Sequence, residues 1–506
     1  MKKIVCLLAF ILINNITEKI KAQSGTVRIK DIEAAMPVLD KIFKDFATVN
    51  QLPGYAYGLV VDGKLIHTAI SGFTDMEKKI PVSTRSAFRI ASMTKSFTAM
   101  AILKLRDEGK LDLDDPVYNY IPEMKDQKYL TTDAPHITIR QLLTHDAGFP
   151  EDNPWGDRQL AISDEAMISM IKKGISFSNI PGIAYEYSNM GFAMLGYIIK
   201  KVSGLPYEKY ITDNIFIPLK MTHTFWDFKD VPPDLLAHGY NRLNGPLTEE
   251  TLLAGGAYGA MGGMISSIED FSKYVAVHLS AWPPSNDPET GPVKRSSIRD
   301  MQHPWNIPDL NLKYKYPGGQ ACPLVSAYGF GLRWIKDCKG RVNVGHSGGL
   351  PGFGSNWKIF PDYGIGIVSF INLTYAPASI LNTQALDTLI ALAKLQPAKL
   401  RVSDILNQRK KELVHILPSW NKAESSGILA ENFFLDYVKD SLRKEASAIF
   451  ENAGKIIRIN ELVPENNLRG SFIMEGEKSD IEVFFTLTPE NPPLIQEYAI
   501  KEIKKN

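Results

Sequence analysis

The chain has 506 residues, of which 44% are hydrophobic and 22% are charged, and its formal net charge is +1. That length allows two or three domains, and the composition is that of an ordinary globular protein. A nearly neutral chain lacks the basic footprint of a nucleic-acid-binding protein or of one attracted to an anionic membrane.

The N-terminus has the pattern of a signal peptide. Met1-Lys2-Lys3 is a short basic region, and residues 4–13 form an apolar run. Such a run is too short to span a bilayer but suits the core of a signal peptide. We expect cleavage after Ala22, so that residues 1–22 are removed and the protein is exported, to a bacterial periplasm or the medium, without a membrane span.

Two cysteines remain after that cleavage, Cys322 and Cys338. In an oxidising compartment they can pair, but two unpaired cysteines are also common, so the sequence leaves both states open. Neither has the spacing of a metal ligand, and we expect no metal and no cofactor.

The first elements of the mature chain are a helix and a hairpin. Residues 27–47 carry apolar side chains at helical spacing. Residues 55–61 and 65–70 resemble strands, and Asp62-Gly63 between them is a good hairpin turn. A helix then follows Ser92 and ends near Gly109.

Helices are predicted through the middle of the chain and strands toward its end. The helices are expected from residue 137 to Gly148, over 188–203, over 268–279 and over 380–395; the strands are expected at 329–335, 342–345, 356–360 and 365–372. Strands from both ends can then pair in one antiparallel sheet flanked by helices, beside an all-helical block. This is α+β organisation.

The C-terminal part reads as a separate small unit. Residues 399–424 are polar and are expected to be a helical linker, so the main domain would cover 23–398. Residues 425–506 predict a second, small α+β domain of unknown role, with one helix over 428–452 and four strands at 455–461, 468–475, 480–488 and 495–502.

Three short motifs carry candidate chemistry. The first is Ser92-Met93-Thr94-Lys95, where a helix places the serine and the lysine on one face. A serine hydroxyl needs a base beside it, and a lysine with a lowered pKa can be that base. The other two are Tyr187-Ser188-Asn189 and the run from His346 through Ser347, Gly348 and Gly349. Taken singly, each has an ordinary interpretation as a helix turn, a helix cap or a glycine-rich turn.

Taken together and in this order, the three motifs resemble those of the serine β-lactamase and penicillin-binding-protein superfamily. The class C-like branch, which includes esterases, D-aminopeptidases and D-alanyl-D-alanine carboxypeptidases, is the most similar. The resemblance covers about residues 28–395 and does not extend over 420–506.

The resemblance implies a role for each motif. Ser92 would be the acylated nucleophile, Lys95 its base, and Tyr187 a proton relay to the leaving group. Asn189 would hold a substrate amide and orient Lys95. The backbone N–H groups of Ser92 and Gly349 would form the oxyanion hole.

His346, Ser347 and Gly348 complete the substrate-binding set implied by the resemblance. His346 stands where class C lactamases have lysine, and a histidine is mostly neutral at pH 7. We therefore expect better turnover of short esters or D-amino-acid amides and peptides than of β-lactams. An arginine elsewhere in the site would supply the missing charge and weaken this expectation.

Other interpretations of these residues compete with the first. Gly345-His346-Ser347-Gly348-Gly349 also fits the Gly-x-Ser-x-Gly elbow of α/β-hydrolases, which requires a helix directly afterwards. The glycine-rich run 255–263 lacks the lysine of a phosphate loop and is expected to pack closely near the active site. His145 and His223 are expected to be structural.

Two classes of function remain for the whole chain. The first is an exported serine hydrolase that acts through an acyl-enzyme on small-molecule or peptide substrates. The alternative is a catalytically silent penicillin-binding-like sensor or binding protein. The oligomeric state is left open.

Overall fold

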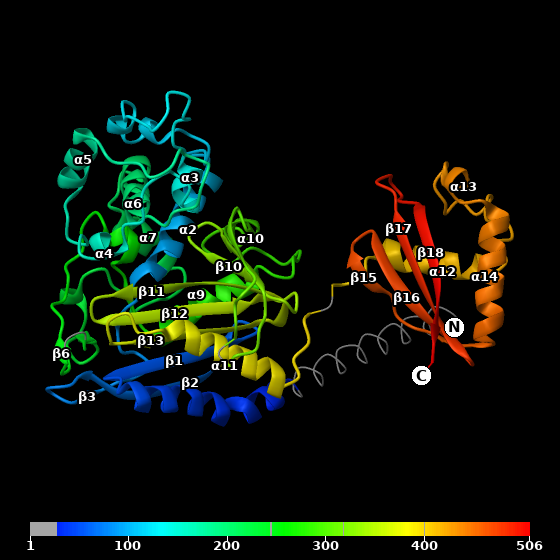
Figure 1. The fold of residues 1–506 in the computed structure, drawn as a ribbon, viewed down its shortest axis with the longest axis horizontal. Helices are drawn as coiled ribbons and strands as arrows, with labels where there is room; N and C mark the ends of the chain where they lie inside the picture. Colours follow the sequence, from blue (N-terminus) through cyan, green and yellow to red (C-terminus); the bar gives the residue numbers. More distant parts are fainter. Residues whose placement is uncertain (1–27, 243–244, 317, 399, 506) are drawn as a thin grey trace, which may run out of the picture. The chain divides into compact units, whose positions relative to one another are not determined.

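The structure, a computed structural model, describes residues 28–242, 245–316, 318–398 and 400–505 (Figure 1). The predicted signal peptide lies outside the described residues. Contacts divide the chain into two compact units, Met1–Pro397 and Ala398–Asn506.

The first unit is built on a nine-stranded antiparallel sheet, which confirms the α+β prediction. The strand order is β3-β2-β1-β13-β12-β11-β10-β9-β8. Strand β1 pairs with β13 through Tyr55 and Ile371, so the two ends of the unit share one sheet as expected. The strands are β1 (Gly54–Val61), β2 (Lys64–Asp75), β3 (Ile80–Pro81), β8 (Asn306–Asn311), β9 (Leu324–Tyr328), β10 (Arg333–Lys336), β11 (Val342–Leu350), β12 (Phe353–Phe360) and β13 (Ile365–Ile371).

The predicted hairpin between β1 and β2 forms at Asp62 and Gly63. Both residues have positive φ, 48° and 77°. Two central residues of this kind match the right-handed twist of the flanking strands, which is why Asp-Gly is favoured in such turns.

Helices cover both faces of the sheet (Figure 1). On one face, residues 28–50 are helical, as expected from 27–47, and they bury Leu39 and Phe43 together with α11 (Ala378–Leu392). On the other face, α9 (Ile268–Ser280) places Phe271 against Phe370 of β13. The helical block continues from this second face.

The helical block and its short connections surround the Ser92 segment. Its helices are η1 (Ala91–Met93), α2 (Thr94–Asp107), α3 (Ile139–Thr144), α4 (Asn153–Gly156), α5 (Asp164–Lys173), α6 (Asn189–Ser203), α7 (Tyr207–Ile211), α8 (Gly259–Gly262) and α10 (Arg295–Met301). Two short strands, β4 (Phe88–Arg89) and β7 (Ile265–Ser266), pair beside it.

Two strand predictions are wrong in detail. The single strand expected at 329–335 is the turn of the β9–β10 hairpin followed by β10, because Gly331 has a φ of 66° and breaks the extended chain. The strand expected to end at Gly345 continues to Leu350, because β12 pairs with it along the whole glycine-rich run.

The C-terminal unit has its own core and begins earlier than predicted. Much of the expected linker 399–424 belongs to it, because α12 (Asp404–Ile416) buries Leu406 and Leu413 there. The helix expected over 428–452 is two, α13 (Phe433–Asp436) and α14 (Lys439–Ala453), and there is an unpredicted strand β15 (Val463–Asn466). The other strands are β14 (Ile456–Ile459), β16 (Arg469–Gly476), β17 (Ser479–Leu487) and β18 (Ile495–Lys504).

Three further features concern the expectations about export and cofactors. Cys322 and Cys338 form a disulfide, which resolves the choice that the sequence left open. Across the described ranges, no helix is long and apolar enough to cross a membrane. Within the same residues, no three His, Cys, Asp or Glu side chains gather as a metal site would require.

Candidate active site

Ser92 lies in a short 3-10 turn that is fixed from two sides. Ala91, just before it, has a φ of 50°, a conformation that non-glycine residues rarely adopt and that is concentrated at functional sites. Ile90 donates its N–H to the carbonyl of Met264 at 3.0 Å, and Ser355 Oγ donates to the carbonyl of Ile90 at 2.7 Å. The turn is therefore held between the sheet and the helical block.

Lys95 is one helical turn further on and is fully buried. Its Nζ donates to Ser92 Oγ at 3.1 Å, to Asn189 Oδ1 at 2.7 Å and to the carbonyl of Met261 at 2.9 Å. The predicted pair of serine and lysine is thus in direct contact. The Met261 carbonyl comes from α8, in the glycine-rich run 255–263, which packs beside the active site as expected.

Burial lowers the pKa of Lys95 to about 7. The carboxylates of Asp157 and Asp152 act in the opposite direction, and the guanidinium of Arg333 adds to the lowering. Desolvation disfavours the ammonium form more strongly than these two acids favour it. At neutral pH a large fraction of Lys95 is therefore a free amine that can accept a proton.

Tyr187 stands beside the lysine. Lys95 Nζ lies 4.9 Å from the centroid of the Tyr187 ring, and the tyrosine is 8% exposed. Burial raises the pKa of Tyr187 well above 10, although the Ser92 hydroxyl and Arg333 act in the opposite direction. The phenol keeps its proton at neutral pH, which suits a relay between other groups better than a base.

Asn189 begins α6, and a cap and a neighbouring acid fix its position. Ser188 caps the helix by accepting the N–H of Gly191 at 3.3 Å. Asp152 accepts the N–H of Asn189 at 2.6 Å, and the Asn189 side-chain amide donates to Asn153 Oδ1 at 3.1 Å. The carbonyl oxygen of the side chain is thereby directed at Lys95.

His346 is buried on β11 and is neutral. Its Nδ1 lies 2.6 Å from the carbonyl of Ser347, which can only accept, so Nδ1 carries the hydrogen and Nε2 accepts from the hydroxyl of Tyr328 at 2.9 Å. Burial lowers the pKa of His346 well below 6.5, and the charges of Arg333 and Lys95 add to this. The predicted neutral state of this histidine follows from its surroundings.

Strand β11 presents a free edge at the motif. β10 pairs with it only over Val342–Gly345, whereas β12 pairs with it from Val344 to Leu350. On the side facing the pocket, the backbone groups after Gly345 are therefore not used by β10. Such an edge can pair with an extended substrate.

Gly348 lets this edge approach the serine. A Cβ at Gly348 would lie 2.2 Å from the carbonyl oxygen of Ile90 and 2.3 Å from Ser355 Oγ, so no larger residue fits. The Gly349 N–H implied for the oxyanion hole belongs to the same segment, and that role stays a prediction.

Six of the eight predicted residues line one pocket of about 510 Å³, and the other two, Lys95 and Asn189, are buried and hydrogen-bonded to each other. Among the lining residues that were not predicted from the sequence, Asp157, Arg333 and Tyr375 carry ionisable side chains. The lining residues that were predicted are Ser92, Tyr187, His346, Ser347, Gly348 and Gly349. A lone Asp, Arg or Tyr has no local motif, so only its position in the fold reveals it.

Arg333 supplies the positive charge that His346 lacks. It lies on β10 beside Gly345, and its guanidinium carbon is 5.6 Å from the centroid of the Tyr187 ring. It is exposed and lines the pocket, and the carboxylate of Glu151 is one of the groups that raise its pKa. Arg333 is therefore an arginine in the site of the kind that would weaken the expectation drawn from His346.

The competing interpretations fail on geometry. The elbow reading of Ser347 requires a helix next, but β12 follows, and Ser347 Oγ accepts a hydrogen bond from Asn356 Nδ2 at 3.0 Å. His145 packs against the Tyr187 ring at 4.3 Å between centroids, and its Nδ1 accepts the N–H of Ser188 at 3.1 Å. His145 thus packs against Tyr187 and helps to fix the position of its ring.

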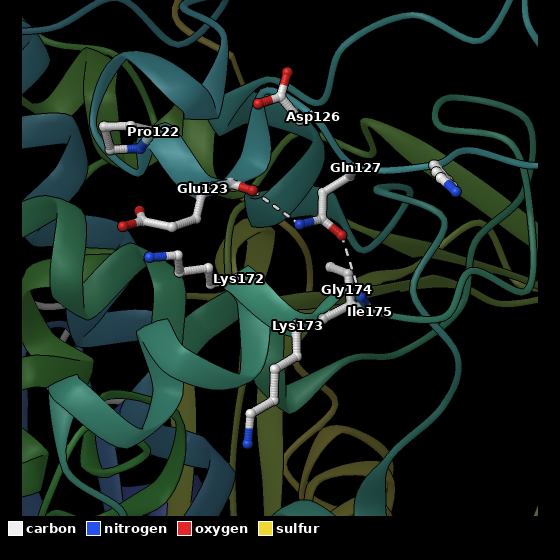
Figure 2. Close-up of a pocket in the computed structure, with 9 residues that line it drawn as sticks. Pro122, Glu123, Asp126, Gln127, Lys172, Lys173, Gly174 and Ile175 are labelled. Atoms are coloured by element: carbon white, nitrogen blue, oxygen red, sulfur yellow. Dashed lines mark hydrogen bonds between the residues drawn. The ribbon is translucent and has the colours of Figure 1, made fainter.

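A second hollow of about 610 Å³ lies at the end of α5, and among the described residues no Ser, Thr, Cys or His lines it (Figure 2). One of its lining side chains, Gln127, donates to the carbonyls of Glu123 and Ile171, both at 2.8 Å, and accepts the N–H of Ile175 at 3.1 Å. The amide is fully used in holding the loop, so this hollow offers no comparable chemistry.

Known proteins are similar to this chain in sequence and in fold. Protein flp of Staphylococcus aureus (strain N315) is 31% identical over 360 residues, which are 68% of this chain and 66% of that protein. Beta-lactamase-like protein 2 of Dictyostelium discoideum is 30% identical over 299 residues, which are 57% of this chain and 53% of that protein. The chain therefore spans slightly less than two thirds of the first of these relatives.

Two solved structures agree with the fold. The octameric penicillin-binding protein homologue from Pyrococcus abyssi superposes with a TM-score of 0.59 at 22% identity, covering 93% of this chain and 96% of that one. A D-stereospecific amidohydrolase from Streptomyces sp. superposes with a TM-score of 0.51 at 25% identity, covering 66% and 93%. The Beta-lactamase family model matches residues 39–390, and the chain belongs to that family of serine hydrolase fold.

Proposed function

We propose that this protein is a serine hydrolase that works through an acyl-enzyme on Ser92. The contact between Lys95 Nζ and Ser92 Oγ at 3.1 Å, with a lysine pKa of about 7, supports this most directly. A base whose pKa is close to the working pH is effective in general-base catalysis. The catalytically silent alternative gives no reason for a buried lysine whose pKa is lowered to about 7.

The proposed reaction has two halves. In the first, Lys95 takes the proton of Ser92, Oγ attacks the substrate carbonyl, and the backbone N–H groups of Ser92 and Gly349 stabilise the oxyanion. Tyr187 passes a proton to the leaving nitrogen or oxygen and regains one from Lys95. In the second half, a water molecule gives its proton to the same pair and attacks the ester carbonyl. The acyl C–O bond to Ser92 then breaks, the acid is released, and Oγ takes that proton back from the pair.

The substrates we propose are short peptides or amides of D-amino acids, with esters as weaker relatives. Arg333 beside His346 can hold a carboxylate on the leaving half of the substrate, because a guanidinium binds carboxylates through two parallel hydrogen bonds. The D-stereospecific amidohydrolase among the structural neighbours supports the D-amino-acid part of the proposal. Because Arg333 is present, His346 alone no longer predicts weak binding of β-lactam carboxylates.

The test is active-site labelling. A fluorophosphonate or a fluorescent penicillin should label the wild type on a peptide that contains Ser92, and Ser92→Ala should abolish both labelling and hydrolysis. We expect the unfolding free energy of Ser92→Ala to change by less than about 1 kcal/mol, since one small group is removed. Labelling that persists in Ser92→Ala but disappears in Ser347→Ala would contradict the assignment.

We also propose that the protein is exported. The basic and apolar start of the sequence motivates this, and the Cys322–Cys338 disulfide supports it because such bonds persist in oxidising compartments. Mass spectrometry of the protein secreted by its host should find a mature N-terminus at Gln23. Recovery of the uncleaved chain from the cytosol would contradict the proposal.

A further inference from the structure

The active-site pocket carries opposite charges at its two ends. At one end, Arg333 pairs with Gly345 of β11. At the other, the ring of Tyr375 covers Gly349, where an added Cβ would lie 2.7 Å from Tyr375 Cδ1, and the Tyr375 hydroxyl donates to Asp157 Oδ2 at 3.0 Å. Gly345 and Gly349 are four positions apart along the strand, about 13 Å at the usual rise.

Tyr375 and Asp157 close the second end of the pocket. Tyr375 comes from the segment between β13 and α11, whereas Asp157 follows α4 in the helical block. Their hydrogen bond therefore joins the two walls. Both residues line the pocket, and Oδ1 of Asp157 accepts no hydrogen bond from any residue that the structure describes. A short group that reaches this end meets one carboxylate oxygen without a donor.

The positions of Arg333, Ser92 and Asp157 assign each end of the pocket to one half of the substrate. A peptide extended along β11, with its scissile carbonyl at Ser92, would place its leaving half near Arg333 and its acyl half near Asp157. We propose that Asp157 is a specificity residue that binds an ammonium group on the acyl half of the substrate. The preferred substrates are then short D-amino-acid peptides or amides with a free amino group. This inference rests on the proposed function.

The groups around Asp157 compensate its negative charge only in part, so the carboxylate can bind a substrate cation. Burial raises the pKa of Asp157 to about 6; the Tyr375 hydroxyl, Lys95 and Arg158 lower it, and Asp152 raises it further. The group is therefore mainly a carboxylate at pH 7. Lys95, with a pKa of about 7, is protonated only in part at that pH, so it compensates this carboxylate only in part.

The test compares two substrates that differ in one charge, D-alanine p-nitroanilide and N-acetyl-D-alanine p-nitroanilide. Neither leaving group has a carboxylate, so Arg333 does not influence the comparison. At pH 7.0 the free α-amine is mostly protonated. We expect the wild type to favour the free amine by about tenfold or more in kcat/KM, as for a hydrogen bond between charged groups.

Asp157→Asn removes the charge and keeps the size of the side chain, and its ratio of the two kcat/KM values should fall to about one. Glu151→Gln is the matched control, because this exposed acid is in the same loop but does not line the pocket. Its ratio should stay at the wild-type value. A ratio that persists in Asp157→Asn, or that falls equally in Glu151→Gln, overturns the inference.

The wild type alone offers a second measurement if Asp157→Asn fails to fold. The ratio should decrease between pH 7 and pH 5, because Asp157 takes up a proton and the increasing charge of Lys95 beside it also disfavours an ammonium group. The loss of Lys95 as a base cancels in the ratio, because both substrates need it. A ratio that is flat over this range overturns the inference. If Ser92 is labelled and both anilides are cleaved equally well by the wild type, only the inference fails; if Ser92 is not labelled, the proposed function fails with it.

Discussion

Replacing Lys95 by methionine should change how the unfolding free energy of the protein depends on pH. The side chain of methionine has a similar length and no charge, so Lys95→Met removes the base and should abolish hydrolysis. In the wild type, the pKa of Lys95 is about 7 when folded and near 10.4 when unfolded. Between these values the unfolded chain binds a proton that the folded protein does not, so the stability of the wild type rises with pH.

The size of this effect follows from the two pKa values. A difference of nearly one bound proton corresponds to about 1.4 kcal/mol per pH unit, so the wild type should gain about 2 kcal/mol over Lys95→Met between pH 7.5 and 9. The neighbouring groups do not obscure this window. Asp157 titrates near pH 6, and the pKa values of His145 and His346 are lowered well below 6.5.

Urea unfolding of both proteins at several pH values in this range measures the difference. The C-terminal unit and all unchanged groups contribute equally to the two proteins, so they cancel. The absolute offset is harder to assign, because methionine leaves the acceptors Asn189 Oδ1 and the Met261 carbonyl without their donor. A difference that stays constant from pH 7.5 to 9 would refute the reasoning, since Lys95 would then be charged in the folded protein.

Three further predictions concern the site and the boundary of the catalytic unit. Lys95→Arg should be nearly as inactive as Lys95→Ala in a steady-state assay, because arginine keeps the charge but cannot act as a base; good turnover would make Lys95 an electrostatic element only. Arg333→Gln should reduce kcat/KM about tenfold for a D-alanyl-D-alanine peptide and for nitrocefin, with little loss on p-nitrophenyl acetate. Arg333→Lys should restore part of the lost kcat/KM, and equal losses on all three substrates would exclude carboxylate binding. A chain that ends at Pro397 should fold and remain active. A chain that ends at Ser419 should be less soluble, because Leu406 and Leu413 lose the core of the C-terminal unit against which they pack; the reverse result would move the boundary between the two units.

Local sequence determined most of the secondary-structure elements and the contact between Ser92 and Lys95. Periodicity and turn residues predict the hairpin at Asp62-Gly63 and the α6 helix. Local residues signal both ends of that helix, because Ser188 caps its start and Gly204 ends it. Ser92 and Lys95 are one turn apart on the same segment, so helical geometry alone brings them into contact. The resemblance to a family then joined this pair with Tyr187 and Asn189.

Sequence reasoning failed where long-range pairing overrides a local signal. Glycines at Gly348 and Gly349 read as a turn, yet β12 holds them in a strand. The polar stretch with Leu406 and Leu413 read as a linker, although the sheet of the C-terminal unit buries its apolar face. In both cases the deciding contacts come from residues that are distant in the sequence.

Only the tertiary structure decided the electrostatics of the site. Arg333, Asp157 and Tyr375 come from three separate segments, and none belongs to a motif. The lowered pKa of Lys95 is a consequence of its burial, which depends on how the helical block packs on the sheet. A pKa and a charge pattern are properties of an environment in three dimensions, so sequence spacing identifies the reacting groups but cannot determine what they bind.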